Sequence, residues 1–252
     1  MRLAAVAAVV ALVAPADAGA TRPPVALIAS PSHVDLIGSG RSVVTVTNSG
    51  TEKAVVDVLR AGYALDLRGR PRVAVRRASW LAVVPARLTL DPGTSRAITV
   101  VSKLPRRAQP GDHPELVLFT TKAFPRRGLP VRVRLGVVVV VRAPGKVVHR
   151  LELAGARVRR AARNRILRLR IANRGNVIEA LNPGCPRVAV RRGRVLLATL
   201  RLPRRRLLPR TSALVDVVYR GRFRGAARVR LSPRAGSRCP VVGRGRWFSV
   251  RI

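Results

Sequence analysis

Residues 42–59 read SVVTVTNSGTEKAVVDVL, in which two runs of alternating β-branched residues flank an Asn-Ser-Gly triplet. Alternation with a period of two is typical of strands that bury one face, and Asn and Gly accept the left-handed backbone of a tight connection. The same order returns at residues 167–181, LRLRIANRGNVIEAL, where Asn-Arg-Gly separates two alternating runs. Both stretches therefore predict a pair of antiparallel strands joined by an Asn-x-Gly turn.

A second repeated pattern supports a duplicated organisation. Residues 90–101, LDPGTSRAITVV, are echoed by residues 207–218, LLPRTSALVDVV, and this aligns Thr94 with Thr211. Short alternating segments cut by Gly, Pro and Asn fill most of the chain, and no segment has the pattern of an amphipathic helix. The sequence therefore predicts the all-β class, with two consecutive immunoglobulin-like β-sandwich domains. Chance similarity between β-rich segments is the alternative explanation of the repeat.

The predicted domain boundaries depend also on the N-terminus. Residues 1–20, MRLAAVAAVVALVAPADAGA, combine Arg2, a short apolar run and an Ala-x-Ala triplet, which is the pattern of a cleaved signal peptide. The run is too short to span a bilayer, and no later run reaches membrane length, so we expect no transmembrane helix in the mature chain. An uncleaved anchor or a buried helix is the alternative. We expect an exported protein with domains at residues 21–143 and 144–252, joined by an Ala-Pro-Gly-Lys linker.

Export changes how the two cysteines are interpreted. Cys185 and Cys239 lie in the C-terminal half, and an even number of cysteines in a secreted chain usually forms disulfides. We therefore predict a Cys185–Cys239 disulfide, which would contribute about 4 kcal/mol to stability in the chain-entropy model. A catalytic or metal-binding role is the alternative.

The chain is strongly basic, with 50 Lys and Arg residues against 11 Asp and Glu and a formal net charge of +39. Specific nucleic-acid sites use stacking aromatics or an element that reads a groove, whereas aromatics make up 3% of this chain and no such motif is present. Outside the cell the same charge would attract anionic glycans and teichoic acids. The candidate polyanion-binding residues occupy alternate strand positions: Arg132, Arg134, Arg168 and Arg170. The alternative is that they form the solvated face of each sandwich.

No arrangement of residues predicts catalysis, a metal or a cofactor. The acidic residues form no pair of general acid and base, and His33, His113 and His149 are too scattered to form a metal site. We expect Trp80 and Trp247 to pack in the cores, with stacking on carbohydrate as the alternative. The sequence therefore predicts a non-enzymatic protein without a cofactor.

The most apolar strand pattern lies at residues 131–142, VRVRLGVVVVVR. Its period of two places Val131, Val133 and Leu135 toward the core and their arginine neighbours toward water, and the five consecutive valines favour burial on both faces. We predict that this segment is the last strand of the first sandwich. Whether its edge is covered or offered to a partner is left open by the pattern.

Residues 80–121 connect a Trp, a Pro-x-x-Leu-x-Leu step, a Pro-Gly turn, a strand, and a second Pro-Gly turn followed by another strand. This skeleton resembles the WxL-interacting proteins, which are bacterial cell-surface proteins with paired immunoglobulin-like domains. The Val-rich strand at residues 131–142, its Gly-containing linker and the later Asn-x-Gly turn extend the resemblance over most of residues 25–230. The resemblance implies that residues 21–143 bind peptidoglycan and that residues 144–252 bind a partner protein.

The same passage resembles, more distantly, the pilus-assembly chaperones of the periplasm. These are paired immunoglobulin-like sandwiches with a Pro-x-x-Leu-x-Leu-x-Pro-Gly segment, which residues 85–93 match. This second resemblance implies a hydrophobic edge strand exposed for client proteins and paired basic residues in the cleft between the domains. The membrane helix with which WxL-interacting proteins usually end has no counterpart here, so we expect a secreted or wall-associated form.

Two functional predictions follow. The leading one is an exported, non-enzymatic cell-surface protein that binds cell-wall polymer (peptidoglycan or an anionic glycan), a surface protein, or both. The alternative is a chaperone-like or adaptor protein that captures a β-strand of a partner by edge pairing. Specific nucleic acid is not an expected partner of either.

Overall fold

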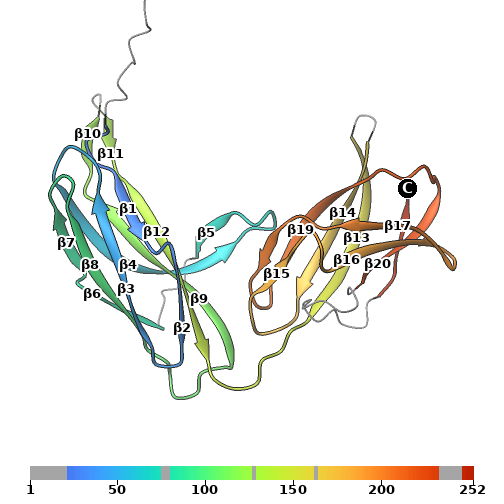
Figure 1. Cartoon of the computed structure of the whole chain (residues 1–252), viewed down its shortest axis with the longest axis horizontal. Coiled ribbons are helices and arrows are strands. Elements are labelled where there is room, and N and C mark those ends of the chain that lie inside the picture. The colour runs from blue at the N-terminus through green and yellow to red at the C-terminus, as the bar shows by residue number, and fades with distance from the viewer. Residues whose placement is uncertain (1–21, 75–79, 127–128, 162–163, 233–245) are drawn as a thin grey trace, which may run out of the picture.

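The structure is a computed structural model that describes residues 22–74, 80–126, 129–161, 164–232 and 246–252. Every regular element in these ranges is a β-strand, and the strands form two sandwiches with separate apolar cores (Figure 1). The predicted all-β class with two immunoglobulin-like sandwich domains is confirmed. The predicted signal peptide lies outside the described residues.

The first sandwich contains two sheets around one core. One sheet has the order β1-β3-β8-β6 and the other β2-β12-β9-β4-β5, with β7 also paired to β4 and a separate β10–β11 ladder. The fully buried core residues include Val44, Val100, Phe119 and Val139. The strands are β1 (Leu27–Ser30), β2 (His33–Ile37), β3 (Arg41–Asn48), β4 (Ala54–Leu65), β5 (Pro71–Ala74), β6 (Leu81–Val84), β7 (Arg87–Leu90), β8 (Ser95–Ser102), β9 (Gly111–Thr121), β10 (Phe124–Arg126), β11 (Leu129–Val131) and β12 (Arg134–Ala143).

The second sandwich repeats this plan with fewer strands. Its sheets have the orders β13-β14-β19 and β17-β16-β20-β21, beside a short β15–β18 ladder. The fully buried core residues include Leu167, Ile171, Val190 and Val229. The strands are β13 (Leu151–Ala161), β14 (Asn164–Asn173), β15 (Glu179–Leu181), β16 (Arg187–Arg192), β17 (Val195–Arg201), β18 (Arg205–Leu207), β19 (Ser212–Tyr219), β20 (Ala226–Ser232) and β21 (Phe248–Arg251).

Asn48 ends β3, and its fully buried side chain holds the following turn together. Its Nδ2 donates to the carbonyl oxygens of Glu52 at 2.7 Å and of Leu90 at 3.2 Å. Its Oδ1 accepts a hydrogen bond from the Gly50 amide at 3.0 Å. One amide side chain therefore satisfies three backbone groups that the turn removes from the ladder.

Asn173 repeats this arrangement at the end of β14 and is also fully buried. Its Nδ2 donates to the carbonyl oxygens of Val177 at 2.7 Å and of Leu207 at 3.2 Å, and its Oδ1 accepts from the Gly175 amide at 2.9 Å. The same three bonds in both domains make the two Asn-x-Gly stretches structurally equivalent. The repeat predicted from the sequence is therefore present in the fold.

The Thr94 and Thr211 stretches are equivalent as well. Each threonine carbonyl accepts a hydrogen bond from the amide of the buried asparagine in its own domain, at 3.0 and 2.8 Å. The residue before each threonine has a positive φ, 72° at Gly93 and 58° at Arg210. Arg210 thus adopts a conformation for which glycine is the usual choice, and the duplicated turn keeps its geometry despite this substitution.

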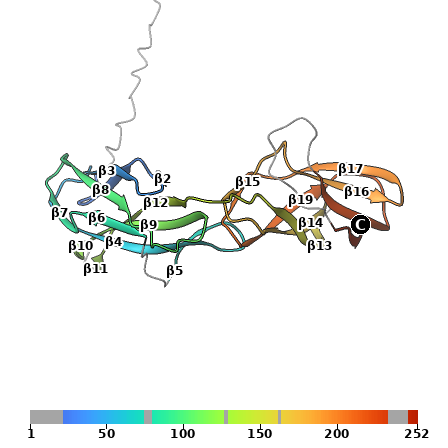
Figure 2. The ribbon, with the colours of Figure 1, turned by 90° about the horizontal axis from the view of Figure 1, so that it is seen from below.

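The two domains lie end to end in an elongated molecule (Figure 2) and touch outside their linker. The β4–β5 hairpin reaches from the first sandwich to the second (Figure 1), where the amide of Leu214 in β19 donates to the carbonyl of Leu67 at 2.7 Å. The second domain therefore receives a backbone contact from the first at the edge of its three-stranded sheet.

Replacing Asn173 by Ala should lower the free energy of unfolding by about 2–4 kcal/mol, because three hydrogen bonds are lost where water cannot replace them. Urea denaturation followed by circular dichroism measures the change. The matched control is Asn164→Ala at the exposed start of β14, for which we expect a change within about 0.5 kcal/mol. Equal losses in the two variants would contradict a stabilising role for the buried network.

Candidate functional site at the edge of β12

β12 is the Val-rich strand, and the two sides of its backbone differ. On one side it pairs with antiparallel β9 along its entire length. On the other side β2 runs parallel to it and pairs with residues 138–142. Among the described residues, no strand pairs with residues 134–137 on that second side. The N-terminal half of β12 is therefore a free sheet edge, here called the β12 edge.

The β12 edge is left free because the first strand of the domain changes sheets. β1 pairs with β3 in the opposite sheet, and β2 begins at His33 after the chain has crossed the sandwich. The Val138 amide donates to the Ser32 carbonyl at 3.1 Å, which is where contact with β12 starts. The two residues between β1 and β2, Pro31 and Ser32, make this crossing, and its position sets how much of β12 stays unpaired.

The side chains of the β12 edge alternate between apolar and charged. Val133 and Leu135 are half-buried against the first core, and Val137 is fully buried. Arg132 and Arg134 are exposed. The inward and outward positions predicted for this segment are therefore correct, and the free backbone lies between an apolar row and a basic row.

β11 continues the β12 edge away from the core. Leu129 in β11 is 68% exposed, and Val131 is half-buried. Thr121 connects the two parts, since its amide donates to the Val133 carbonyl and its Oγ1 accepts from the Val133 amide, both at 3.0 Å. Exposed apolar edges invite pairing with another chain, and natural proteins usually protect them.

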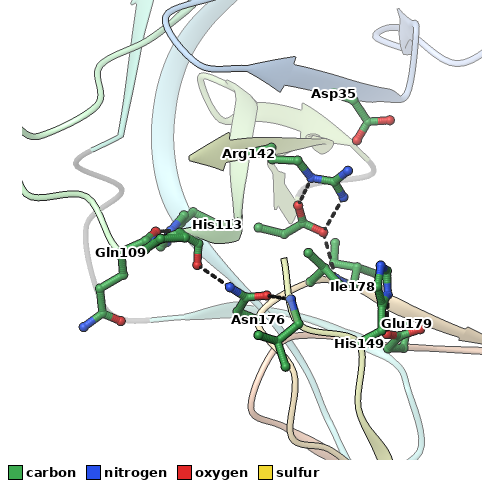
Figure 3. Close-up of polar contacts among 12 residues, drawn as sticks. Asp35, Gln109, His113, Arg142, His149, Asn176, Ile178 and Glu179 are labelled. Atoms are coloured by element: carbon green, nitrogen blue, oxygen red, sulfur yellow. Dashed lines mark hydrogen bonds and ion pairs between the residues drawn. The ribbon is translucent and has the colours of Figure 1, made fainter. Parts of the chain in front are cut away.

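The other end of β12 is fixed to the second domain through Asp112, which bonds to both Arg142 and Ile178 (both labelled in Figure 3). The Asp112 carboxylate is 1% exposed and accepts hydrogen bonds from Arg142 Nε at 2.6 Å, Arg142 Nη2 at 3.0 Å and the Ile178 amide at 2.7 Å. The hydrogen bond to Asp112 raises the pKa of Arg142. Asp112 thus joins β9, β12 and the second domain at one buried carboxylate.

Asn176 adds a second polar link between the domains (Figure 3). Its carbonyl accepts from the Asp112 amide at 2.8 Å, and its Nδ2 donates to the carbonyls of Pro110 at 2.9 Å and Lys146 at 2.8 Å. A Cβ placed on Gly111 would lie 2.1 Å from the Asn176 carbonyl oxygen. This close approach therefore requires glycine at position 111.

His149 and Glu179 form a polar pair beside this joint (Figure 3). His149 Nδ1 lies 2.9 Å from Glu179 Oε1, and Glu179 is 4% exposed. Burial raises the pKa of Glu179, and the hydrogen bond with His149 opposes that rise. The pair thus joins an exposed histidine to a buried carboxylate, and the described residues contain no cluster suited to a metal ion.

Trp80 lines a hollow of about 680 Å³ between the domains. Its ring stacks on His113 with the centroids 3.9 Å apart and 16° between the planes, and it packs partly against the first core. Its amide donates to Glu115 Oε1 at 3.3 Å, while Glu115 Oε2 is buried without a partner among the described residues. Burial raises the pKa of Glu115 to about 7, despite the opposing effects of the Trp80 amide and of Arg60.

The structure separates the arginines that the sequence suggested as polyanion-binding pairs. Arg132 and Arg134 border the β12 edge in the first domain, whereas Arg168 and Arg170 lie on β14 in the second. Arg168 donates to both carboxylate oxygens of Asp216, at 2.9 and 2.8 Å. The four residues do not form one surface, and their binding role stays a prediction.

Other predicted residues have structural surroundings. Trp247 is half-buried, with the guanidinium of Arg230 4.6 Å from its ring centroid. His33 Nε2 lies 3.1 Å from the Asp35 carboxylate. The Cys185–Cys239 disulfide stays a prediction because position 239 lies outside the described residues. No helix in the described part of the chain is long and apolar enough to cross a membrane.

Comparison with solved structures identifies the fold. The chain is similar to the class 5 fimbriae chaperone CfaA, with a TM-score of 0.50 and 15% identity over 90% of this chain and 98% of that chain. It is also similar to a chain of the chaperone–tip adhesin complex for CFA/I fimbriae biogenesis, with a TM-score of 0.51 and 13% identity over the same shares. At this identity the likeness shows the fold, which is that of the pilus chaperones.

The comparisons support one of the two resemblances read from the sequence. No family model matches the chain, and no curated protein matches it. The resemblance to pilus chaperones agrees with the fold, whereas the resemblance to WxL-interacting proteins has no support. The sequence pattern alone could not choose between the two resemblances. A Pro-x-x-Leu-x-Leu step followed by a Pro-Gly turn describes the strands and turns of paired sandwiches, which pilus chaperones and WxL-interacting proteins both have.

Replacing Asp112 by Asn should loosen the joint between the domains, because hydrogen bonds to a charged group contribute about 1.5–3 kcal/mol. We expect faster cleavage of the linker between β12 and β13 by a protease at low concentration. The control is Asp57→Asn, which breaks a partly exposed pair with Arg87, of the kind worth about 0–1 kcal/mol. Equal cleavage rates in both variants would argue against Asp112 as the joint.

Glu115 should make stability depend on pH. Its pKa is about 7 in the folded chain against a usual 4.5, so the unfolded state loses its proton first as pH rises. The free energy of unfolding should therefore fall between pH 4.5 and 7, by up to about 3 kcal/mol. Denaturation of Glu115→Gln at the two pH values should show a smaller fall than the native chain, and an unchanged fall would refute the assignment.

Proposed function

We propose that this protein is a chaperone-like or adaptor protein that captures an extended strand of a partner protein at the β12 edge. The observation that carries the proposal is the half-covered strand: β2 pairs with residues 138–142 and leaves residues 134–137 free. Adding a strand at a free sheet edge gives affinity through backbone hydrogen bonds and specificity through alternate side chains. The likeness to a fimbriae chaperone supports this class of function.

The side chains beside the β12 edge define the kind of strand that fits. The row of Val133, Leu135 and Val137 offers an apolar surface on the core side, and Arg132 and Arg134 offer positive charge on the other. Opposite charges on neighbouring strands stabilise pairing, and apolar cross-strand pairs do the same. The partner strand should therefore alternate apolar and acidic or small polar residues.

The proposed function is accompanied by a proposed domain boundary and by proposed export of the protein. We propose a boundary between residues 143 and 144, because β12 ends at Ala143 and β13 starts at Leu151. The signal-peptide pattern at residues 1–20 supports export of the protein. We propose that it meets its partner strand outside the cytoplasm. Binding of cell-wall polymer has no comparable support, since the predicted arginines lie in two separate places.

A synthetic nine-residue peptide of alternating valine and glutamate, capped at both ends, tests this proposal by fluorescence anisotropy. We expect binding to the native chain and about tenfold weaker binding to Leu135→Thr, which keeps β-propensity but makes the apolar row polar. The matched control is Val195→Thr at the exposed edge strand β17, where we expect no change. Circular dichroism confirms that both variants are folded.

A second peptide, methylated at every backbone nitrogen, separates edge pairing from plain charge attraction. It keeps every side chain and charge but loses the donors that a β-ladder needs. We expect its binding to be lost at about 0.15 M salt, where attraction between exposed charges is screened beyond about 8 Å. Equal binding of the two peptides, or equal weakening in both variants, would rule out strand capture at this edge.

A further inference from the structure

A second concave site lies between the two domains, away from the β12 edge. The β4–β5 hairpin reaches the second sandwich (Figure 1), and residues of the hairpin, β13, β14, β18 and β19 line a hollow of about 540 Å³. We call this hollow the arginine notch, and its lining residues are Arg68, Arg70, Arg159, Arg168, Arg205, Leu214 and Asp216. Its volume lies in the range of about 300–1,000 Å³ that is usual for small-molecule sites.

Polar contacts fix the walls of the arginine notch. The backbone bond from β19 to the hairpin holds the two domains together at one side. Arg205 Nη1 donates to the Arg68 carbonyl, which adds a link from β18 to the hairpin tip. Within the tip, Asp66 Oδ1 accepts from the amides of Arg68 at 2.8 Å and Arg70 at 2.9 Å. The arginines therefore project from a backbone that is already ordered, which lowers the cost of binding.

The charges in the arginine notch are strongly unbalanced. Asp216 is engaged by Arg168 through both oxygens, and this contact lowers the pKa of Asp216. The Nε of Arg205 is buried and has no hydrogen-bond partner among the described residues. Four guanidiniums line the hollow without forming an ion pair in the described part of the chain: Arg68, Arg70, Arg159 and Arg205.

We propose that the arginine notch binds an oxyanion of the phosphate class and holds it between the two domains. Guanidinium groups present paired N–H donors that match phosphate oxygens, and a phosphate group carries more than one negative charge. One carboxylate would neutralise a single cation of the four, whereas a diphosphate carries several negative charges and a phosphate polymer carries more. Asp216 does not compete, because Arg168 already occupies both of its oxygens.

The test is titration calorimetry with inorganic pyrophosphate at about 0.15 M salt, where diffuse attraction is screened. We expect one pyrophosphate to bind per native chain. In the double variant Arg70→Gln with Arg159→Gln the dissociation constant should be at least about tenfold higher than in the native chain, because each substitution removes about one charge-assisted hydrogen bond. Neither side chain forms a hydrogen bond or an ion pair in the described part of the chain, so the double variant should fold normally. Bound pyrophosphate should raise the melting temperature of the native chain more than that of the variant.

The matched control is Arg157→Gln combined with Arg170→Gln, which removes the same charge from exposed positions on β13 and β14 outside the hollow. Its dissociation constant should stay within twofold of the native value. An equal loss in both double variants, or no stoichiometric binding to the native chain, would overturn the proposal. Long-chain polyphosphate in the same titration identifies the source: tighter binding per phosphate indicates a polymer, and equal binding indicates a free anion.

Discussion

The buried carboxylate of Asp112 is the contact on which the arrangement of this molecule depends. It neutralises Arg142 at the end of β12, and it accepts a hydrogen bond from the backbone of the second domain at Ile178. A charge at 1% exposure is stable when it is fully hydrogen-bonded, and removal of one partner is costly. Both hollows between the domains exist because this joint and the β4–β5 contact hold the two sandwiches in one arrangement.

The function proposed for the first domain comes from a single topological choice. Its first strand divides between the two sheets, so that β2 can cover part of β12 and no more. Full coverage would have produced a closed sandwich, and absence of β2 would have left a long edge open to aggregation. Arg132 and Arg134 are exposed at alternate positions beside this edge, and their charge is the reason for proposing a partner strand with acidic residues.

The sequence predicted the features that depend on residue type and local spacing. An Asn-x-Gly turn needs a buried amide and a glycine at a fixed distance, and the alternation in residues 131–142 set the inward and outward side chains. The extent of coverage by β2 could not be predicted, because it depends on where the chain crosses between sheets. Two contacts between the domains could not be predicted either, because they depend on how the domains are placed. One is the hydrogen bond from Ile178 to Asp112, and the other is the shared hollow lined by Arg70 and Arg159.

In the proposed function, a partner strand pairs with the backbone of residues 134–137. Amide hydrogen exchange with and without the alternating Val-Glu peptide tests it most directly. Strand capture at the β12 edge should slow exchange of the Arg134 and Gly136 amides, which point to the same side of the strand as the Val138 amide that donates to Ser32. Exchange at residues 138–142, which β2 already covers, should not change. Unchanged exchange at residues 134–137 while the peptide is bound, or protection confined to the second domain, would contradict it.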